Sequence, residues 1–256
     1  MYASNFSLAD YFDRIGFRTE ASADIASIRA IMRCQLFSVP FENLDVQAGK
    51  IVSLIPEEIV EKIVGRRRGG YCYEVNGIFA MALEAMQIPY QFVAARPMFY
   101  PTRRPKTHMA VLVHLQGETW LCDLGFGSYG IRAPMQLSVI DLAIQQDEDR
   151  FMLTRTDNGE YLLKACVENE WASQYAFDLS PWEWIDFMPA NYLNSTHPDA
   201  IFVQKPLVVL HDPAGRKILF GGMLKTVANG KVTKQVIAKD ALTSVLSREF
   251  GLTVPA

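Results

Sequence analysis

One cysteine stands where the chain could turn a thiol into a nucleophile. Cys72 follows Gly69 and Gly70, and the alanine-, methionine- and leucine-rich segment after it predicts a helix from Glu74 to Met86. The two glycines permit a tight or left-handed turn directly before the cysteine. At the start of a helix, free backbone N–H groups and the helix dipole favour an anion, and a thiolate is such an anion. Cys72 is therefore a candidate covalent nucleophile.

A thiol nucleophile normally needs a base and a group that orients the base. Of the four histidines, His108 opens an apolar run that predicts a strand, and Asp123 ends the next such run. Gln116 and Gly117 lie between the two runs. If they form a two-residue turn, Ala110 lies opposite Asp123, and His108 becomes its diagonal neighbour on one face. A loop one residue longer would place the two side chains on opposite faces.

A Cys-His-Asp order is shared by several classes of thiol enzyme, among them hydrolases, proteases and transglutaminases. These classes stay open at this point, as does a non-catalytic binding protein that keeps the fold. The other three cysteines form no CxxC pair and show no zinc-ligand spacing, so we expect no metal site. They are expected to be small buried hydrophobes: Cys34, Cys122 and Cys166.

The first ninety residues predict helices. Ser7 is expected to cap a first helix that Gly16 closes, and residues 25–36 carry a second apolar stripe at helical spacing. Pro56 stands just inside a third, short helix that Gly65 ends. With the helix after Cys72, these elements form a helical N-terminal part.

Strand patterns dominate from about residue 89 to 180. The expected strands include residues 91–94, 108–115, 119–124 and 161–167, and hairpin turns are expected at 157–159, 212–215 and 229–230. A last helix is expected over about residues 240–250. Helices followed by a sheet and then by a mixed part indicate an α+β fold rather than alternating β-α-β units.

Composition narrows the function classes. The 256 residues are half hydrophobic and about a fifth charged, as in ordinary globular enzymes, and the formal net charge of −3 does not fit a nucleic-acid-binding protein. We find no signal peptide and no apolar run near the roughly 18 residues of a membrane span. The sequence therefore predicts a cytoplasmic protein with neither nucleic-acid nor membrane partners.

Four strings around these residues resemble the arylamine N-acetyltransferase family. Residues 68–76 (RGGYCYEVN) resemble its nucleophile motif, and residues 39–45 (VPFENLD) its N-terminal signature. Residues 107–109 (THM) and 123–127 (DLGFG) resemble its histidine and aspartate motifs, and the segment from Asp186 to Phe202 is similar to a later block. The likeness spans roughly residues 25–225 in order.

The resemblance implies a fold of three parts: an N-terminal helical bundle at 1–88, a β-barrel-like domain at 89–195 and a C-terminal α/β lid at 196–256. It also implies an enzyme of xenobiotic metabolism. That enzyme would transfer an acetyl group from acetyl-CoA to small arylamines and arylhydrazines through an acetyl-cysteine intermediate. A thiol hydrolase or transglutaminase-like enzyme with the same triad is the alternative.

The resemblance also implies roles for individual residues. The catalytic triad carries over as Cys72, His108 and Asp123. The aromatic walls of the acceptor pocket are implied at Phe41, Tyr73, Phe126 and Phe202, and contacts with coenzyme A at Thr107 and Gly127. Two positions depart from the family pattern, which often has a histidine where this chain has Gln35 and a serine where it has Ala200. We expect Arg68 and Glu42 to form a structural ion pair.

Overall fold

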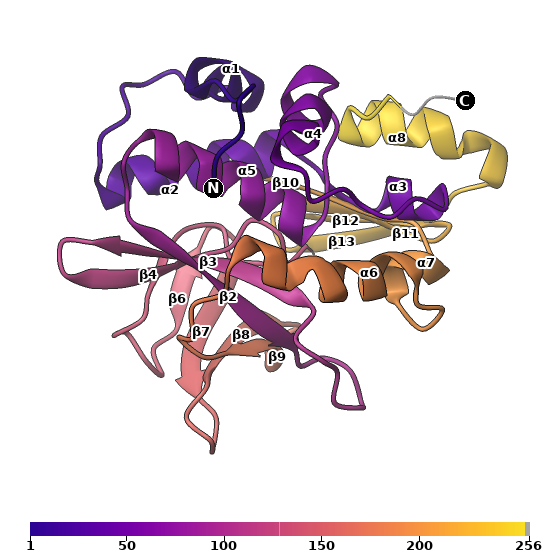
Figure 1. Ribbon diagram of the computed structural model, residues 1–256. Helices are drawn as coiled ribbons and strands as arrows, with labels where there is room; N and C mark the ends of the chain where they lie inside the picture. The colour runs from indigo at the N-terminus through magenta and orange to yellow at the C-terminus, as the bar shows by residue number, and fades with distance from the viewer. Residues whose placement is uncertain (128, 254–256) are drawn as a thin grey trace.

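The computed structural model describes residues 1–127 and 129–253. Its N-terminal part is a layer of helices (Figure 1), and the predicted helical pattern is confirmed there. These elements are α1 (Leu8–Ile15), α2 (Ile25–Ser38), α3 (Leu44–Gln47), α4 (Pro56–Val60), the π-helical turn η1 (Glu61–Gly65) and α5 (Cys72–Ala85). The Ser7 side chain accepts a hydrogen bond from the Asp10 amide, and Gly16 closes α1 in the left-handed conformation, with φ of 72°.

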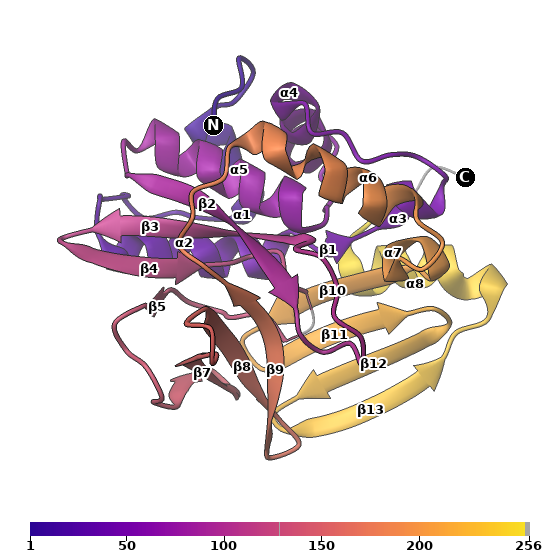
Figure 2. The same ribbon diagram turned by 60° about the horizontal axis from the view of Figure 1, so that its bottom comes forward.

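The middle of the chain forms one antiparallel sheet of eight strands, which curls into a partial barrel (Figures 1 and 2). Its spatial order is β5-β4-β3-β2-β9-β8-β7-β6. The strands are β2 (Tyr90–Pro97), β3 (His108–Leu115), β4 (Glu118–Cys122), β5 (Met135–Gln136), β6 (Ile144–Gln146), β7 (Asp149–Arg155), β8 (Tyr161–Val167) and β9 (Glu170–Phe177). Helix α5 packs against β3 of this sheet.

The hairpin between β3 and β4 has the register that the sequence analysis required. Leu115 pairs with Glu118, and Gln116 and Gly117 form the two-residue turn with φ of 53° and 79°. Positive φ at both central positions is the geometry of a type I′ hairpin turn. His108 and Asp123 therefore lie on the same face, at the end of the hairpin nearest α5.

The C-terminal part is a second sheet, of five strands, that lies beside the curled sheet in Figure 2. Its order is β1-β10-β11-β12-β13, from β1 (Phe41–Glu42), β10 (Leu207–Asp212), β11 (Gly215–Phe220), β12 (Met223–Ala228) and β13 (Lys231–Val236). The accompanying helices are η2 (Trp184–Phe187), α6 (Met188–Thr196), α7 (Ile201–Gln204), η3 (Lys239–Ala241) and α8 (Leu242–Phe250). The hairpin turns predicted at residues 212–215 and 229–230 are confirmed.

Arg132 fastens the two sheets to each other. Its guanidinium, fully buried, donates to the Asp149 carboxylate at 2.7 Å and to the carbonyl oxygens of Asp212 and Gly215 at 2.8 Å. Asp149 belongs to the curled sheet, whereas the two carbonyls flank the β10–β11 turn. A buried charge with this many partners fixes the orientation of the second sheet, because any sliding would leave a desolvated donor unsatisfied.

Two features of the N-terminal half differ from the prediction. Phe41 and Glu42 form the strand β1, which pairs with Val208 and Val209 of β10, so a segment expected to be wholly helical contributes to the C-terminal sheet. A two-residue strand leaves no periodic pattern in the sequence. Helix α5 also begins at Cys72, two residues before the predicted start, because its first turn is set by a cap that involves Glu74.

Candidate active site

The turn before Cys72 depends on Gly69 for a different reason from the one expected. Neither Gly69 nor Gly70 has a positive φ. A Cβ atom on Gly69 would lie 1.9 Å from the carbonyl oxygen of Pro40, so only glycine lets these two backbones approach. The Gly70 N–H donates to that oxygen at 3.2 Å, and its carbonyl accepts from the Glu42 N–H at 3.0 Å. The turn that carries Cys72 is therefore held against β1.

Cys72 is the first residue of α5 and so lies at the N-terminal end of the helix, where the sequence analysis expected it, although the helix starts two residues earlier than predicted. The Glu74 carboxylate accepts a hydrogen bond from the Tyr71 N–H at 3.0 Å and closes the helix start. The Cys72 side chain is 3% exposed and lines a cavity. Gly125 packs directly against it, since a Cβ at that position would lie 2.5 Å from the Cys72 Cα. The thiol therefore stands at a helix N-terminus, in a site with little access to water.

His108 and Asp123 meet beside this thiol. The His108 Nε2 lies 2.8 Å from the Asp123 Oδ2, and both side chains are almost completely buried. The other ring nitrogen remains for Cys72, whose side chain also forms a hydrogen bond with His108. Asp123 follows the last residue of β4, and His108 is the first residue of β3. The structure thus brings Cys72, His108 and Asp123 together.

Asn76 completes this set, although the sequence analysis did not single it out. Its side-chain amide donates to the Asp123 Oδ1 at 3.0 Å and to the Met109 carbonyl at 2.7 Å, and its oxygen accepts from the Leu124 N–H at 2.8 Å. Asn76 lies one helical turn after Cys72, on the same face of α5. An amide in a helix rich in Ala, Met and Leu was the available signal, and the structure shows that it is fully buried.

Burial and neighbouring charges shift the pKa values of His108 and Asp123 in opposite directions. Burial lowers the pKa of His108, but the Asp123 carboxylate and the hydrogen bonds to Asp123 and Cys72 outweigh it and raise the pKa to about 10. Burial raises the pKa of Asp123, but His108, Asn76 and the Gly125 N–H together hold it below its usual value. Both groups therefore favour their charged forms at neutral pH.

The cavity in front of Cys72 and His108 has a volume of about 890 Å³. Three of the four predicted aromatic walls line it: Phe41, Phe126 and Phe202. Tyr73 lies one layer behind, fully buried, with its ring against Tyr71 and Phe187. Such a volume is in the usual range for a small-molecule site.

Of the two predicted contacts with coenzyme A, Thr107 lines this cavity, whereas Gly127 is not among the lining residues. The Thr107 carbonyl oxygen accepts hydrogen bonds from the Tyr73 hydroxyl at 2.9 Å and the Asn194 amide at 3.0 Å. Gly127 has φ of 89°, and a Cβ there would lie 3.6 Å from the Phe41 ring. The His211 Nε2 lies 3.2 Å from the Gly127 carbonyl, so the loop is tied to β10.

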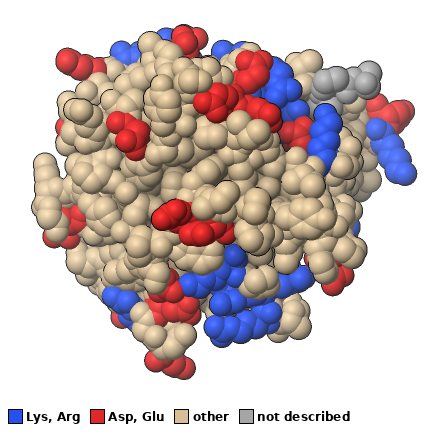
Figure 3. Space-filling view, in the orientation of Figure 1, with Lys and Arg blue, Asp and Glu red and all other residues tan. Residues whose placement is uncertain are grey.

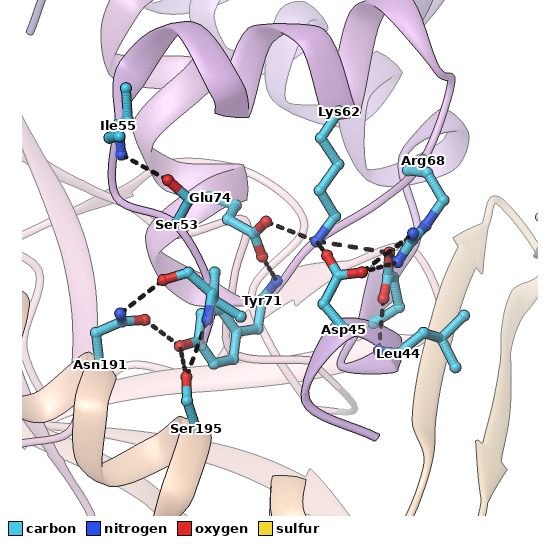
Figure 4. A network of polar contacts seen from close by, with 12 residues as sticks. Leu44, Asp45, Ser53, Ile55, Lys62, Arg68, Tyr71, Glu74, Asn191 and Ser195 are labelled. Atoms are coloured by element: carbon cyan, nitrogen blue, oxygen red, sulfur yellow. Dashed lines mark hydrogen bonds and ion pairs between the residues drawn. The ribbon is translucent and has the colours of Figure 1, made fainter. Parts of the chain in front are cut away.

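A buried network of charges lies behind the turn that carries Cys72 (Figure 4). The predicted ion pair is confirmed, because the Arg68 guanidinium lies 2.6 Å from the Glu42 carboxylate. The Lys62 ammonium, which was not predicted, lies 2.6 Å from both Asp45 and Glu74. In the same view, the Tyr71 hydroxyl points to Asn191 and Ser195 of α6.

Gln35 and Ala200, the two departures from the family pattern, lie in different surroundings. Gln35 is buried and bridges three helices, since its oxygen accepts from the Tyr11 hydroxyl at 2.5 Å and its amide donates to the Val75 carbonyl at 2.8 Å. Ala200 precedes α7 and lines the cavity, where it offers a methyl group and no hydrogen-bonding group.

Comparison with known proteins assigns the family. Residues 24–256 match the family described as N-acetyltransferase. The arylamine N-acetyltransferase of Escherichia coli K12 is 31% identical, over 96% of this chain and 89% of its own length. The chain belongs to the arylamine N-acetyltransferase family.

Solved structures agree with this assignment. The arylamine N-acetyltransferase of Mycobacterium abscessus superposes with a TM-score of 0.91 at 28% identity, over 98% of this chain and 91% of that one. The enzyme of Mycobacterium marinum in complex with CoA has a TM-score of 0.90 at 28% identity, over 96% and 92%. The predicted α+β fold and the predicted acyltransferase class are thereby confirmed. Within residues 1–127 and 129–253, no helix is long and apolar enough to cross a membrane.

Proposed function

We propose that this arylamine N-acetyltransferase uses acetyl-CoA as donor and passes the acetyl group through Cys72 to arylamines and arylhydrazines. The observation that carries the proposal is the 2.8 Å contact of His108 with Asp123 beside a thiol at the N-terminus of α5. The names of the related enzymes support the acceptor class, and the CoA complex of the Mycobacterium marinum enzyme supports the donor.

The resting state we propose is a thiolate–imidazolium pair. Because the pKa of His108 is raised to about 10, the imidazole retains the proton that the Cys72 thiol gives up. Asp123 accepts from Nε2–H and so fixes the tautomer that leaves Nδ1 for the sulfur. Asn76 and the Gly125 N–H hold the other carboxylate oxygen, so the acid cannot rotate away.

The first half-reaction acetylates the enzyme. The thiolate of Cys72 attacks the thioester carbonyl, and a tetrahedral oxyanion forms next to the first turn of α5. Backbone N–H groups there can stabilise that charge, since Glu74 and Val75 both donate to the Tyr71 carbonyl and leave the preceding amides free for it. The C–S bond to coenzyme A then breaks, CoA leaves as a thiolate that takes the imidazolium proton, and acetyl-Cys72 remains.

The second half-reaction consumes the acetyl group. The amine nitrogen attacks acetyl-Cys72 while the now neutral His108 accepts its proton, and the C–S bond to Cys72 breaks. Phe41, Phe126 and Phe202 act as the acceptor walls, because flat rings favour planar substrates. We assign Thr107 and Gly127 to the path of coenzyme A, and Tyr73 to the support of Thr107.

We retain the division into three parts as part of this proposal. Residues 1–88 supply the nucleophile, residues 89–195 supply the histidine and the aspartate, and residues 196–256 form a lid.

The test is incubation with acetyl-CoA in the absence of any amine, followed by intact and peptide mass spectrometry. We expect one acetyl group on the peptide that contains Cys72 and release of one equivalent of CoA. Later addition of an arylamine should remove the acetyl group and yield the amide. An adduct on Cys34, Cys122 or Cys166 would contradict the mechanism, and hydrolysis of the adduct without amide formation would indicate a thiol hydrolase.

A further inference from the structure

A cationic side chain lines the cavity without a carboxylate partner. Arg104 lies on the loop between β2 and β3, and it is half-buried among the lining residues. Its Nη2 donates to the Asp199 carbonyl at 3.3 Å, whereas its Nε is buried and has no hydrogen-bond partner. In the described part of the chain, no carboxylate lies within 4.0 Å of this guanidinium. A buried donor left unpaired costs free energy, so the position suits a ligand that supplies an acceptor.

Aromatic rings connect this guanidinium to the catalytic imidazole. The His108 ring lies 5.1 Å from the Phe126 ring, which lies 6.0 Å from Phe99, and the Phe99 ring lies 4.3 Å from Tyr100. The Arg104 guanidinium stacks over the Tyr100 ring at 4.7 Å. A planar substrate that follows these rings has its reacting end near His108 and its far end toward Arg104.

The loop holds the guanidinium in place before any ligand arrives. The Arg96 side chain donates to the carbonyl oxygen of Arg104, and Lys106 forms an ion pair with Asp178 at the end of the same loop. Stacking on Tyr100 and the bond to Asp199 fix the side chain itself. A planar guanidinium that is already oriented suits a carboxylate or sulfonate, which it can bind with two parallel hydrogen bonds.

Most of the charged side chains that line the cavity are positive, like Arg104. Its lining contains the cations Arg104, Lys225 and Lys234, against the single carboxylate of Asp199, although the whole chain has a net charge of −3. Lysine and arginine side chains also gather at the lower edge of the face in Figure 3, over the β2–β3 loop of Figure 1. The cavity mouth therefore attracts anions in a protein that is otherwise acidic.

We propose that Arg104 selects aromatic amines or hydrazines that carry a carboxylate or sulfonate remote from the reacting nitrogen. The inference rests on the proposed function, since it assigns one end of the acceptor to Cys72. Coenzyme A also carries anionic groups that a guanidinium could bind. The aromatic path from His108 to Arg104 favours the acceptor, because it offers ring surface along its whole length.

The test compares matched acceptors that differ only in charge. The probes are 4-aminobenzoate and the longer 4-aminohippurate, each paired with its neutral primary amide. For every acceptor, kcat/KM is measured with the wild type and with Arg104→Gln, and acetylation by acetyl-CoA alone is measured separately as CoA release. Arg103→Gln is the matched control, because Arg103 is exposed, is adjacent in sequence and does not line the cavity.

For at least one pair, we expect Arg104→Gln to lower the preference for the anionic acceptor tenfold or more, about 1.4 kcal/mol. Arg103→Gln should keep the wild-type preference. If Arg104→Gln slows acetylation by acetyl-CoA and leaves the acceptor preference unchanged, the anion is a phosphate of CoA and the proposal is wrong. Unchanged values in both half-reactions also overturn it. A wild type that acetylates neither member of either pair would instead refute the proposed function.

Discussion

Two clusters of buried charge lie on opposite sides of the segment from Arg68 to Glu74. On one side, Cys72 meets His108 and Asp123. On the other, Arg68 and Glu74 join Glu42, Asp45 and Lys62 in the network of Figure 4. The clusters have similar ion-pair distances, and all their charged side chains except Asp45 are buried, yet only the first includes residues that line the cavity.

The comparison shows that shifted pKa values alone do not identify an active site. Burial raises the pKa of Glu74 to about 7, even though Lys62 opposes this, and the three carboxylates around Lys62 raise the pKa of its ammonium despite burial. These shifts are as unusual as that of His108. What distinguishes the proposed catalytic cluster is that a thiol and an imidazole, Cys72 and His108, line the wall of a cavity, where a substrate can reach them. The network instead anchors the turn that carries Cys72.

The largest expected effect comes from removing the negative charge of Asp123, in the cluster that contains Cys72 and His108. Asp123→Asn should lower the acetylation rate by roughly three to four orders of magnitude. Without the carboxylate, burial dominates and lowers the pKa of His108, and the amide at position 123 donates to Nε2, which moves the imidazole proton to Nδ1. Stopped-flow measurement of CoA release checks the rate, and urea unfolding checks that the fold persists.

A pH profile tests the same pair. Because its pKa is raised to about 10, His108 stays protonated throughout pH 6–8, and the proposed thiolate–imidazolium pair then predicts that iodoacetamide alkylates Cys72 at a nearly constant rate there. Cys34, whose pKa burial raises, serves as the internal control and should react only at higher pH. A wild-type Cys72 rate that climbs through pH 8 as steeply as that of Cys34 would show that the proton stays on sulfur.

The second effect is on stability and belongs to the network. Lys62→Met should destabilise the fold by about 3–5 kcal/mol, because it leaves the Glu74 carboxylate buried without a cation, whereas Asp45 keeps its ion pair with Arg68. Lys50→Met, at an exposed site, is the control and should change stability by less than about 0.5 kcal/mol. Urea unfolding gives both values. A Lys62 variant with normal stability and impaired acetylation would contradict this assignment, because the network would then serve catalysis and not stability.

The cluster of Cys72, His108 and Asp123 was more predictable from the sequence than its surroundings. The three residues were singled out because each stands at an element boundary: a glycine turn, a strand start and a strand end. The register that joins the last two followed from a two-residue turn at Gln116 and Gly117. Such signals are local, so one chain segment suffices to recognise them.

The remaining site residues depend on contacts between distant segments. Lys62 meets three carboxylates from two other segments, Glu42 and Asp45 on one and Glu74 on the other, and no pattern near it in the sequence predicts that meeting. Tyr175 lies deep in β9 with its ring 4.9 Å from that of His108, and strand alternation says only that it is buried. The pairing of β1 with β10 joins residues 41 and 209 and is equally invisible to local propensity.

A smaller effect is expected at the cavity wall, where Phe126 lies next to His108. Phe126→Ala should raise the apparent acceptor KM by about three- to tenfold, as expected when an aromatic contact worth 0.5–1.5 kcal/mol is lost. Acetylation of Cys72 by acetyl-CoA should slow less. The two half-reactions are measured separately, by CoA release and by amide formation. Equal losses would mean that Phe126, whose ring lies 5.1 Å from that of His108, shapes the catalytic loop instead.

The smallest effect is expected at His114, which lies on the same strand and face as His108. It is half-buried, and its ring nitrogens meet only neutral oxygens, the Thr119 hydroxyl at 3.2 Å and the Gln91 amide oxygen at 3.3 Å. His114→Gln retains a donor and an acceptor there, so activity should stay within about twofold and stability within about 0.5 kcal/mol. Steady-state acetyl transfer and urea unfolding measure both quantities. If His114→Gln is as inactive as Asp123→Asn, then a carboxylate partner and a place at the cavity wall do not define the base, and His108 has been assigned wrongly.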